Sequence, residues 1–444
     1  MTAAAPTRTL VVGAGGREHA LAWKLAGEPG GNEVVVAPGS AAIAREPRVR
    51  CLPDIDPLDP AAVVGAARRE AVELVVVGPE APLAAGVADA LSEAGFAVFG
   101  PSQAAARIES SKAFCHDVAA AAGVRMAEAK AFEDRAAAAA FAERVAGRGG
   151  GVVIKADGLA AGKGVTVCDT LDEAIRAIDD LVREPAGATV VIEERLTGRE
   201  ASLIALCDGR NAVALPAARD YKRLLDGDEG PNTGGMGAYS PLEDLPDEEA
   251  ERLLDIFHRP LLAELARRGT PFRGALYAGV MLTPDGPRLL ECNARFGDPE
   301  TQAIMPRLAV ALGPFLLAAA RGDLRPAIAG ASIGGLRLPT LPGSAVAIVL
   351  AAAGYPALPR SGDPISGLDA AVAGGALVFH AGTAIDADRT VRTAGGRLLS
   401  VVGRGPDLLT ARAVASRAAD RIEAPGLQRR RDVGLELAAS GAGR

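Results

Sequence analysis

The sequence is poor in aromatic residues, in paired cysteines and in positive charge. Phe, Trp and Tyr make up 3% of its 444 residues, so its cores must be filled by smaller side chains. Lys and Arg number 48 against 55 Asp and Glu, which gives a net charge of −7. Because nucleic-acid binders and proteins of anionic membranes present a basic surface, we expect neither partner. The five cysteines form no C-x-x-C pair and are expected to be reduced thiols of a cytoplasmic protein.

Long hydrophobic runs are missing as well. The most apolar stretch, Leu308 to Ala320, is interrupted by Gly313 and Pro314. It is too short to cross a bilayer, which takes about 20 residues. The N-terminal residues MTAAAPTRTLVVG lack the charged start and the apolar run of a signal peptide. We therefore expect a soluble protein, and its 49% apolar residues are enough to fill more than one core.

Short apolar runs alternate with helical patterns in the first part of the chain. We expect a helix over residues 15–26 and strands over residues 9–12, 33–37, 74–77 and 97–99. This alternation is typical of a doubly wound, mostly parallel α/β sheet. Each strand is followed by a turn-forming group, namely GAGG, PGS, GPEAP or GPS. Ligands of such sheets bind at the carboxyl ends of the strands, so these turns predict one small-molecule site.

The pattern changes from about residue 107. We expect helices over residues 110–122, 171–182 and 247–268, and strands over residues 152–155, 165–168, 189–193, 201–207, 212–215, 275–282 and 288–292. A third unit with short β-like runs begins near residue 326. The expected domains are residues 1–106, 107–325 and 326–428, followed by a polar tail over residues 429–444.

The first candidate site is the glycine-rich turn in VVGAGGREHA, residues 11–20. Glycines after a strand let backbone N–H groups and a helix N-terminus approach a phosphate. Glu18 occupies the place of the third glycine of a dinucleotide fingerprint, and the second strand ends without an acidic residue, so NAD is not expected. A tight turn without a ligand remains the alternative. Glu80, in GPEAP, is either a ligand of sugar hydroxyls or a solvated loop carboxylate.

The second candidate is KADGLAAGKGV, residues 155–165. Its glycines are one residue too close for a Walker loop, and Gly164 follows Lys163 where Ser or Thr is needed. The turn links two strands, which favours a β-turn lid over phosphates with Lys155 as a fixed charge. An ordinary flexible hairpin is the alternative, but an unpaired lysine on the apolar VVIK strand would be costly.

The third candidate is the strand Glu291-Cys-Asn293-Ala-Arg295. Residues two apart in a strand share a face, so these three side chains project together. A carboxylate and an amide oxygen suit Mg²⁺, and the guanidinium suits a transferring phosphoryl group. The alternative is an exposed Glu–Arg pair worth less than about 1 kcal/mol.

A fourth candidate joins RDYKR (residues 219–223) to GPNTGGMGAYSP (residues 230–241). Charges beside a glycine-rich loop suggest a segment that folds over substrate, and a solvated loop is the alternative. The four histidines show no metal spacing, and no Ser-His-Asp or Cys-His arrangement can be argued.

These motifs together resemble a known family. GAGGREHALAWK, VVVGPEAPL, SSKAF, IKADGLAAGKGV, GPNTGGMGAYSP, NARFGDPETQ and VFHAGT are similar to segments of the phosphoribosylamine–glycine ligases, also called glycinamide ribonucleotide synthetases, within the ATP-grasp ligases. The resemblance spans residues 13–383. It implies an N-terminal substrate domain, an ATP-grasp core with a mobile lid over about residues 126–192, and a small C-terminal α+β domain.

The resemblance also implies a reaction: glycine is joined to 5-phosphoribosylamine with ATP and Mg²⁺ or Mn²⁺, in a monomer. ATP ligands would be Lys112, Lys155, Gly158, Gly162, Lys163, Gly164, Glu193, Glu194, Leu196 and Glu200. Substrate ligands would be Gly13, Gly15, Gly16, Arg17, Glu18, Gly78, Pro79, Glu80, Asp220, Lys222 and Arg223. Glu291 and Asn293 would bind the metal, and Arg295, Lys155 and Asp298 would be catalytic.

Two departures from the family pattern stand out. Tyr221 replaces the usual histidine of a DHKR motif, and residues 183–188 are a short substitute for an FG-x-AG turn, which predicts a smaller rear edge of the lid. Other classes remain open: an ATP-grasp ligase with a different acid or amine, and a nucleotide-binding regulatory protein without catalysis. The intact Glu291 and Asn293 pair speaks against the second.

Overall fold

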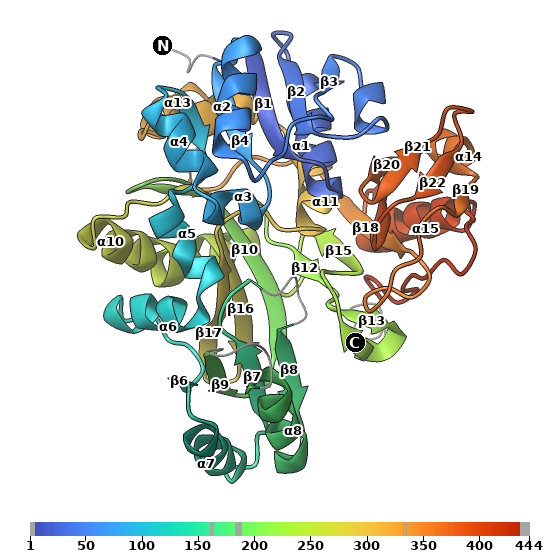
Figure 1. The fold of residues 1–444 in the computed structure, drawn as a ribbon. Coiled ribbons are helices and arrows are strands. Elements are labelled where there is room, and N and C mark those ends of the chain that lie inside the picture. Colours follow the sequence, from blue (N-terminus) through green and yellow to red (C-terminus); the bar gives the residue numbers. More distant parts are fainter. Residues whose placement is uncertain (1–4, 160–163, 183–188, 332, 334, 436–444) are drawn as a thin grey trace.

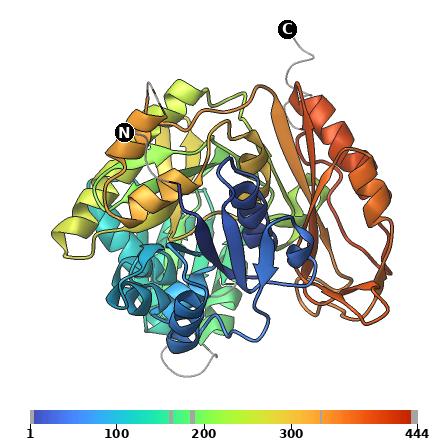
Figure 2. The ribbon, with the colours of Figure 1, turned by 90° about the horizontal axis from the view of Figure 1, so that it is seen from above.

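The computed structural model describes residues 5–159, 164–182, 189–331, 333 and 335–435. In the view of Figure 1 the N-terminal unit lies at the top, a small unit of strands and helices lies at the bottom, and the C-terminal unit lies at the right. An antiparallel sheet in the centre connects them. Figure 2, seen from above, shows the C-terminal unit beside the body of the molecule rather than on top of it.

The N-terminal sheet is parallel throughout, in the order β3-β2-β1-β4-β5. Its strands are Val49–Cys51, Glu33–Pro38, Arg8–Gly13, Leu74–Val77 and Ala97–Phe99. Leu10 and Val12 point into one core and Val11 into another, so the sheet is covered on both faces. The surrounding helices are α1 (Gly16–Ala26), α2 (Pro60–Arg69), α3 (Glu80–Ala84), α4 (Val87–Glu93) and α5 (Gln103–Ser110).

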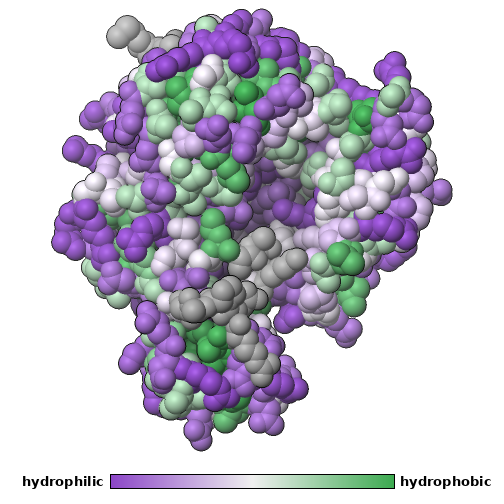
Figure 3. All heavy atoms as spheres, in the orientation of Figure 1, coloured by the Kyte–Doolittle hydropathy of each residue, from purple (hydrophilic) through white to green (hydrophobic). Residues whose placement is uncertain are grey.

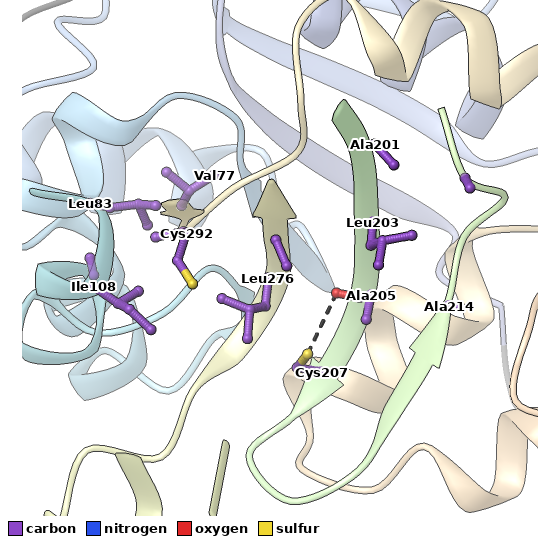
Figure 4. Close-up of a cluster of buried hydrophobic side chains, with 14 of the residues drawn as sticks. Val77, Leu83, Ile108, Ala201, Leu203, Ala205, Cys207, Ala214, Leu276 and Cys292 are labelled. Atoms are coloured by element: carbon purple, nitrogen blue, oxygen red, sulfur yellow. Dashed lines mark hydrogen bonds between the residues drawn. The ribbon is translucent and has the colours of Figure 1, made fainter. Parts of the chain in front are cut away.

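The central sheet is antiparallel, in the order β11-β10-β16-β17. Its strands are Ala212–Ala214, Arg199–Asp208, Arg273–Thr283 and Gly286–Asn293. Helix α12 (Gly313–Ala320) packs against both this sheet and β5, so the two sheets share a core. Figure 4 shows part of a second cluster of buried side chains, which contains Cys207, Cys292, Leu203 and Leu276. The two cysteines act there as small apolar residues.

The small lower unit has a core of its own. Its sheet runs in the order β6-β9-β7-β8, and helices α7 and α8 cover it. The bounds are Ala129–Phe132, Val190–Glu194, Val152–Ala156 and Val165–Cys168 for the strands, and Arg135–Ala146 and Leu171–Val182 for the helices. Because its apolar side chains pack mainly on one another, this unit is able to act as a separate body.

The C-terminal unit is built on a five-stranded sheet in the order β12-β15-β18-β23-β20. Its strands come from two separate parts of the sequence. Its strands are Arg219–Asp220, Gly237–Ser240, Ser344–Ala351, Arg397–Gly405 and Leu377–His380. Two smaller sheets consist of β13 (Arg223–Leu225) with β14 (Glu229–Asn232), and of β19 (Pro364–Ile365), β22 (Val391–Thr393) and β21 (Thr383–Ile385). Residues 219–240 thus complete the sheet of a unit that begins a hundred residues later in the chain.

The remaining helices connect or cover these units. They are α6 (Lys112–Ala121), α9 (Asp247–Leu253), α10 (Arg259–Arg267), α11 (Glu300–Ile304), α13 (Arg325–Gly330), α14 (Leu368–Ala373) and α15 (Leu408–Ala419). Among the residues described, no helix is long and apolar enough to cross a bilayer.

The fold class is confirmed, and four local predictions are corrected. The helix expected over residues 110–122 breaks at Ser111, whose side chain caps α6. The helix expected over residues 247–268 contains a π-helical turn between α9 and α10. Strand β3 and strands β12 to β15 were not predicted, because short strands held by distant partners carry little local signal.

The fourth correction concerns the polar tail expected over residues 429–444. Residues 429–435 pack against the molecule: Arg430 is 1% exposed because it pairs with Asp228 and Asp432, and Val433 is also buried. Residues 436–444 lie outside the described part of the chain. The expected domain boundaries and lid range stay predictions.

Candidate active site

A cavity of about 910 Å³ lies where the N-terminal, central, lower and C-terminal units meet. Figure 3 shows a hollow with hydrophilic side chains in the middle of this face. The predicted residues that line the cavity are Arg17, Pro79, Glu80, Lys112, Lys155, Gly158, Gly164, Glu193, Glu194, Leu196, Glu200, Asp220, Lys222, Arg223, Glu291, Asn293, Arg295 and Asp298. Most of the candidates, scattered over the sequence, therefore share one cavity.

Two further candidates, Gly162 and Lys163, lie outside the described residues. The described candidates that are not part of the cavity lining are Gly13, Gly15, Gly16, Glu18 and Gly78. The Glu18 carboxylate accepts a hydrogen bond from the Gly15 backbone N–H (2.7 Å) and from Arg17 Nε (2.5 Å). A Cβ at Gly13 or Gly78 would come within 2.7 or 2.2 Å of Glu18, so these glycines make room for a buried carboxylate.

Gly16 makes a comparable close approach, since a Cβ there would come within 2.8 Å of the Gln302 amide. Arg17 lies between this turn and the cavity, and its guanidinium also donates to the Phe296 carbonyl (3.2 Å). The sequence suggested a phosphate cradle, whereas the structure shows a packed turn that holds one arginine at the wall. Substrate binding by the glycines stays a prediction.

Lys155 is held by a buried carboxylate. It lies on β7 and Glu193 on the adjacent strand β9, which places the two side chains diagonally across the pair. Lys155 Nζ is 2.7 Å from Glu193 Oε2, and His116 Nε2 is 2.8 Å from Glu193 Oε1. Burial by itself would raise the pKa of Glu193, but the charge of Lys155 and the hydrogen bond from His116 keep that pKa below its ordinary value. Glu193 is therefore charged at neutral pH.

Lys112 starts helix α6, beside the turn that follows β7. Asp157 caps this helix by accepting hydrogen bonds from the backbone N–H groups of Lys112 (2.6 Å) and Ala113 (3.2 Å). Lys112 Nζ donates to the Gly158 carbonyl (2.7 Å). Burial, followed by the nearby charge of Lys155, lowers the pKa of Lys112. Two ammonium groups that repel one another form a natural place for a polyphosphate.

The end of strand β17 and the residues that follow it bring three functional groups to the cavity. Glu291 and Asn293 lie on β17 and Arg295 lies just beyond its end, and all three line the cavity, whereas the intervening Cys292 and Ala294 are buried. A register shift between Gly279 and Val280 precedes this stretch, so the alternation starts afresh at Glu291.

Lys222 bridges two carboxylates on the opposite side of the cavity. Its Nζ lies 2.9 Å from Glu200 Oε2 and 3.4 Å from Glu291 Oε1. The charge of Lys222 lowers the pKa of Glu291 to about 2 despite burial. Glu291 is therefore ionised at neutral pH.

The donor set of Glu291 and Asn293 fits a divalent ion of the Mg²⁺ type. Such ions take one or two protein oxygens and fill their other positions with water and phosphate oxygens. No group of three or more His, Cys, Asp or Glu side chains that could hold a metal occurs among the described residues. A metal here would depend on nucleotide phosphates for its remaining ligands.

Arg295 is fixed by two carboxylates that come from other elements. Its Nε lies 3.2 Å from Glu80 Oε2, and its NH2 lies 3.1 Å from Glu109 Oε1. Glu109 ends α5 and also accepts the Ala294 backbone N–H (2.7 Å). Burial raises the pKa of Glu109, although the charge of Arg295 opposes this shift.

Asp298 connects the cavity to the C-terminal unit. Arg397 donates from NH2 to Asp298 Oδ2 (2.9 Å) and from NH1 to the Asp298 carbonyl (2.8 Å). Gln302 donates to the other carboxylate oxygen (2.7 Å). Burial would raise the pKa of Asp298, but Arg397 and Arg17 hold that pKa below its ordinary value. Asp298 is thus a charged link between units.

Sequence reasoning missed Glu109, His116 and Arg397, together with buried Glu300. Glu300 accepts a hydrogen bond from the Ser202 hydroxyl (3.0 Å), which also lies 2.9 Å from the Tyr277 hydroxyl. Only Glu300 lies in a quoted motif, NARFGDPETQ. The others act as partners of motif residues far away in sequence, so no local pattern could have found them.

Comparisons with known proteins agree with this geometry. Three profiles match: the phosphoribosylglycinamide synthetase N domain over residues 7–109, its ATP-grasp (A) domain over residues 110–301 and its C domain over residues 345–436. A phosphoribosylamine–glycine ligase of Streptomyces coelicolor is 49% identical over 438 residues, covering 97% of this chain and 99% of that protein.

Solved structures show the same likeness. The crystal structure of phosphoribosylamine–glycine ligase from Thermotoga maritima has a TM-score of 0.77 at 34% identity, covering 96% of this chain and 99% of that one. The biotin carboxylase domain of a Hydrogenobacter thermophilus 2-oxoglutarate carboxylase, at 16% identity, has a TM-score of 0.68 and covers 96% and 92%. That second likeness concerns the fold alone.

The fold, together with a charged cavity that the small antiparallel unit helps to line, defines an ATP-grasp enzyme. The profiles cover well over half of the sequence. The chain belongs to the phosphoribosylglycinamide synthetase family, and the resemblance predicted from its motifs is confirmed.

Proposed function

We propose that this chain joins glycine to 5-phospho-D-ribosylamine at the expense of ATP, forming glycinamide ribonucleotide, ADP and phosphate in purine biosynthesis. The observation that carries the proposal is one cavity that gathers Lys112, Lys155 and Arg295 around Glu291 and Asn293. Phosphoryl transfer needs this combination of positive charge and oxygen donors far more than it needs a protein nucleophile.

The reaction has two balanced steps. A glycine carboxylate oxygen attacks the γ-phosphorus of ATP, the bond to the β-phosphate oxygen breaks, and ADP leaves with the electron pair. The amine of phosphoribosylamine then attacks the acyl carbon of glycyl phosphate, the amide bond forms, phosphate leaves, and the nitrogen loses a proton. The first step makes phosphate the leaving group in place of oxide, which is why ATP is required.

The cavity residues divide this work. Lys112 and Lys155 neutralise the ATP phosphates, the stretch from Glu193 to Leu196 meets the adenine, and Glu200 approaches the ribose. The closeness of the two lysines supports the phosphate assignment. Burial is the main cause that lowers the pKa of Lys112, and the nearby charge of Lys155 lowers it further. Positioning of this kind contributes through orientation and through charge stabilisation in a site that excludes water.

The acceptor side uses the groups around Arg295. Arg295 stabilises the transferring phosphoryl group, and Asp298 assists there, held by Arg397. Arg17, Glu80, Asp220, Lys222 and Arg223 face the two organic substrates. Mg²⁺ or Mn²⁺ held by Glu291 and Asn293 supplies charge neutralisation on the phosphate oxygens when bound.

Phosphate release tests the proposal. The chain is given ATP, Mg²⁺ and glycine, with and without freshly made 5-phosphoribosylamine, and the product is identified by mass. Release that requires both substrates and yields glycinamide ribonucleotide is expected. Release with a different acid or amine, and none with this pair, would overturn the substrate assignment.

Two further proposals concern state and location. We propose that the protein is a monomer. Light scattering coupled to size-exclusion chromatography tests this by measuring the molar mass. A cytoplasmic location is proposed because ATP and a phosphorylated sugar amine are the substrates, and fractionation tests it.

A further inference from the structure

The end of the described chain lies against the loop that carries Lys222. We call residues 221–234 the substrate loop and residues 428–435 the C-terminal segment. Arg430, in the C-terminal segment, has a fully buried side chain whose guanidinium lies 4.6 Å from the centroid of the Tyr221 ring. It pairs with Asp228 of the substrate loop (2.5 Å) and with Asp432 of its own segment (2.6 Å).

Backbone groups reinforce this contact in both directions. The Tyr221 hydroxyl accepts a hydrogen bond from the Gly434 N–H (2.8 Å). Asp432 accepts the Gly227 N–H (2.9 Å), and Asp226 accepts the Arg431 N–H (2.6 Å). Each segment thus satisfies polar groups of the other, so neither can shift without losing several bonds at once.

Strand β12 (Arg219–Asp220) and the two residues after it connect this contact to the cavity. Tyr221 N–H donates to the Gly237 carbonyl (2.9 Å), which continues the pairing of β12 with β15. Successive side chains of an extended strand point to opposite faces. Asp220 and Lys222 line the cavity. Tyr221 borders it as well, but its hydroxyl and ring contact Gly434 and Arg430 of the C-terminal segment.

The substrate loop is also closed on itself above Lys222. The Lys222 carbonyl accepts hydrogen bonds from the Thr233 backbone N–H and from the Thr233 hydroxyl, both at 2.8 Å. Asn232 reaches the lower unit, where its amide donates to the Val165 carbonyl (3.3 Å). The loop is therefore tied at its front to the lower unit and at its back to the C-terminal segment.

We propose that Tyr221 is a positioning residue: through its hydroxyl and ring, the C-terminal segment fixes the strand that presents Asp220 and Lys222 to the acid and amine substrates. This inference rests on the proposed function for its kinetic consequences. It assigns a structural role to Tyr221, which stands where the family usually has a histidine. The Tyr221 hydroxyl accepts the Gly434 N–H, and its ring lies against the Arg430 guanidinium.

The test compares Tyr221→Phe, which removes only the hydroxyl, with Asp420→Asn as a matched control. Asp420 pairs with Arg429, so the control weakens the same segment on the side that faces α15. Losing one hydrogen bond that orders the loop is expected to raise the KM for glycine or phosphoribosylamine about fivefold, with the KM for ATP within about twofold. The control leaves all three KM values unchanged.

A second measurement needs no activity. Hydrogen–deuterium exchange in peptides covering residues 221–234 is expected to accelerate in Tyr221→Phe and in Arg430→Gln, but not in Asp420→Asn. Unchanged exchange in Tyr221→Phe, or equal changes in all three KM values, would overturn the inference. A wild-type protein that joins no glycine while the exchange behaves as expected would overturn the proposed function and leave the positioning contact standing.

Discussion

Among the described residues, two lysines of the cavity have carboxylate partners, and they are held in opposite ways. Lys155 is 9% exposed and its partner Glu193 is 3% exposed, so their ion pair is sealed. Lys222 is 32% exposed and shares Glu200 and Glu291, at 40% and 37% exposure. The first pair is part of the interior, whereas the second borders open cavity.

The difference in burial separates a fixed charge from an exchangeable one. Breaking a buried ion pair on one side leaves an uncompensated charge and costs about 3–5 kcal/mol. A partly exposed pair contributes about 0–1 kcal/mol, so its members are easily drawn to other partners. Lys155 is thus suited to hold the phosphates that all turnovers share, and Lys222 is suited to change partners as the metal and the substrates enter.

The largest expected effect comes from breaking the sealed pair. Lys155→Met should lower kcat by about 10³-fold because a charge at the transferring phosphate is lost. It should also lower the free energy of unfolding by about 3 kcal/mol, since the buried Glu193 loses its lysine and keeps only the contact with His116. Urea unfolding and phosphate release measure the two. The double variant Lys155→Met, Glu193→Gln is the control, and it should regain stability without regaining activity.

Removing the metal carboxylate should separate activity from stability. Glu291→Ala is expected to abolish ligation, by about 10³-fold or more, because the phosphates lose the ionised ligand of their metal. The free energy of unfolding should change by less than about 1 kcal/mol, because the Lys222 pair is partly exposed. Normal turnover by this variant would contradict the assignment of Glu291 as a metal ligand.

The open side of the cavity should also show a pH dependence. Burial raises the pKa of Asp220 to about 8 from the ordinary 3.8, against the opposing charge of Lys222. The folded state therefore favours the protonated form, and this stabilisation is present at low pH and is lost as pH rises through 8. Between pH 6 and pH 9 the free energy of unfolding should fall by about 2–3 kcal/mol more in the wild type than in Asp220→Asn. If the free energy of unfolding of the two proteins changed with pH in parallel, the raised pKa of Asp220 would be contradicted.

The smallest expected effect sharpens the contrast with Lys155. Glu200→Gln removes one partner of Lys222 and should change the free energy of unfolding by less than about 0.5 kcal/mol. Chemical denaturation at low and high salt measures it. A loss as large as that of Lys155→Met would mean that the two lysines are held alike.

The parallel sheet could be predicted because it follows local rules: the strand at Leu74–Val77 falls where the apolar run predicts it. The same alternation predicts that Glu291 and Asn293 share a face of β17, and both line the cavity together with Arg295 beyond the strand's end. The resemblance to the family rested on motifs such as IKADGLAAGKGV and NARFGDPETQ.

What sequence could not supply was pairing between distant residues. No local pattern indicated that the Glu18 carboxylate fills the space that Gly13 and Gly78 leave open. Its role as a substrate ligand, which the resemblance implies, stays a prediction. Arg397 and Arg430 had no motif to mark them, since their partners lie more than 90 residues away in Asp298 and more than 200 away in Asp228. Long-range charge pairing leaves no periodic trace in a single sequence.

Oxygen transfer tests the central claim most directly. The enzyme is given glycine labelled with ¹⁸O in both carboxylate oxygens, together with ATP, Mg²⁺ and 5-phosphoribosylamine, and the released phosphate is examined by mass. If glycyl phosphate forms in this cavity, each phosphate carries one ¹⁸O from glycine. Phosphate without label, formed along with the amide product, would contradict the account.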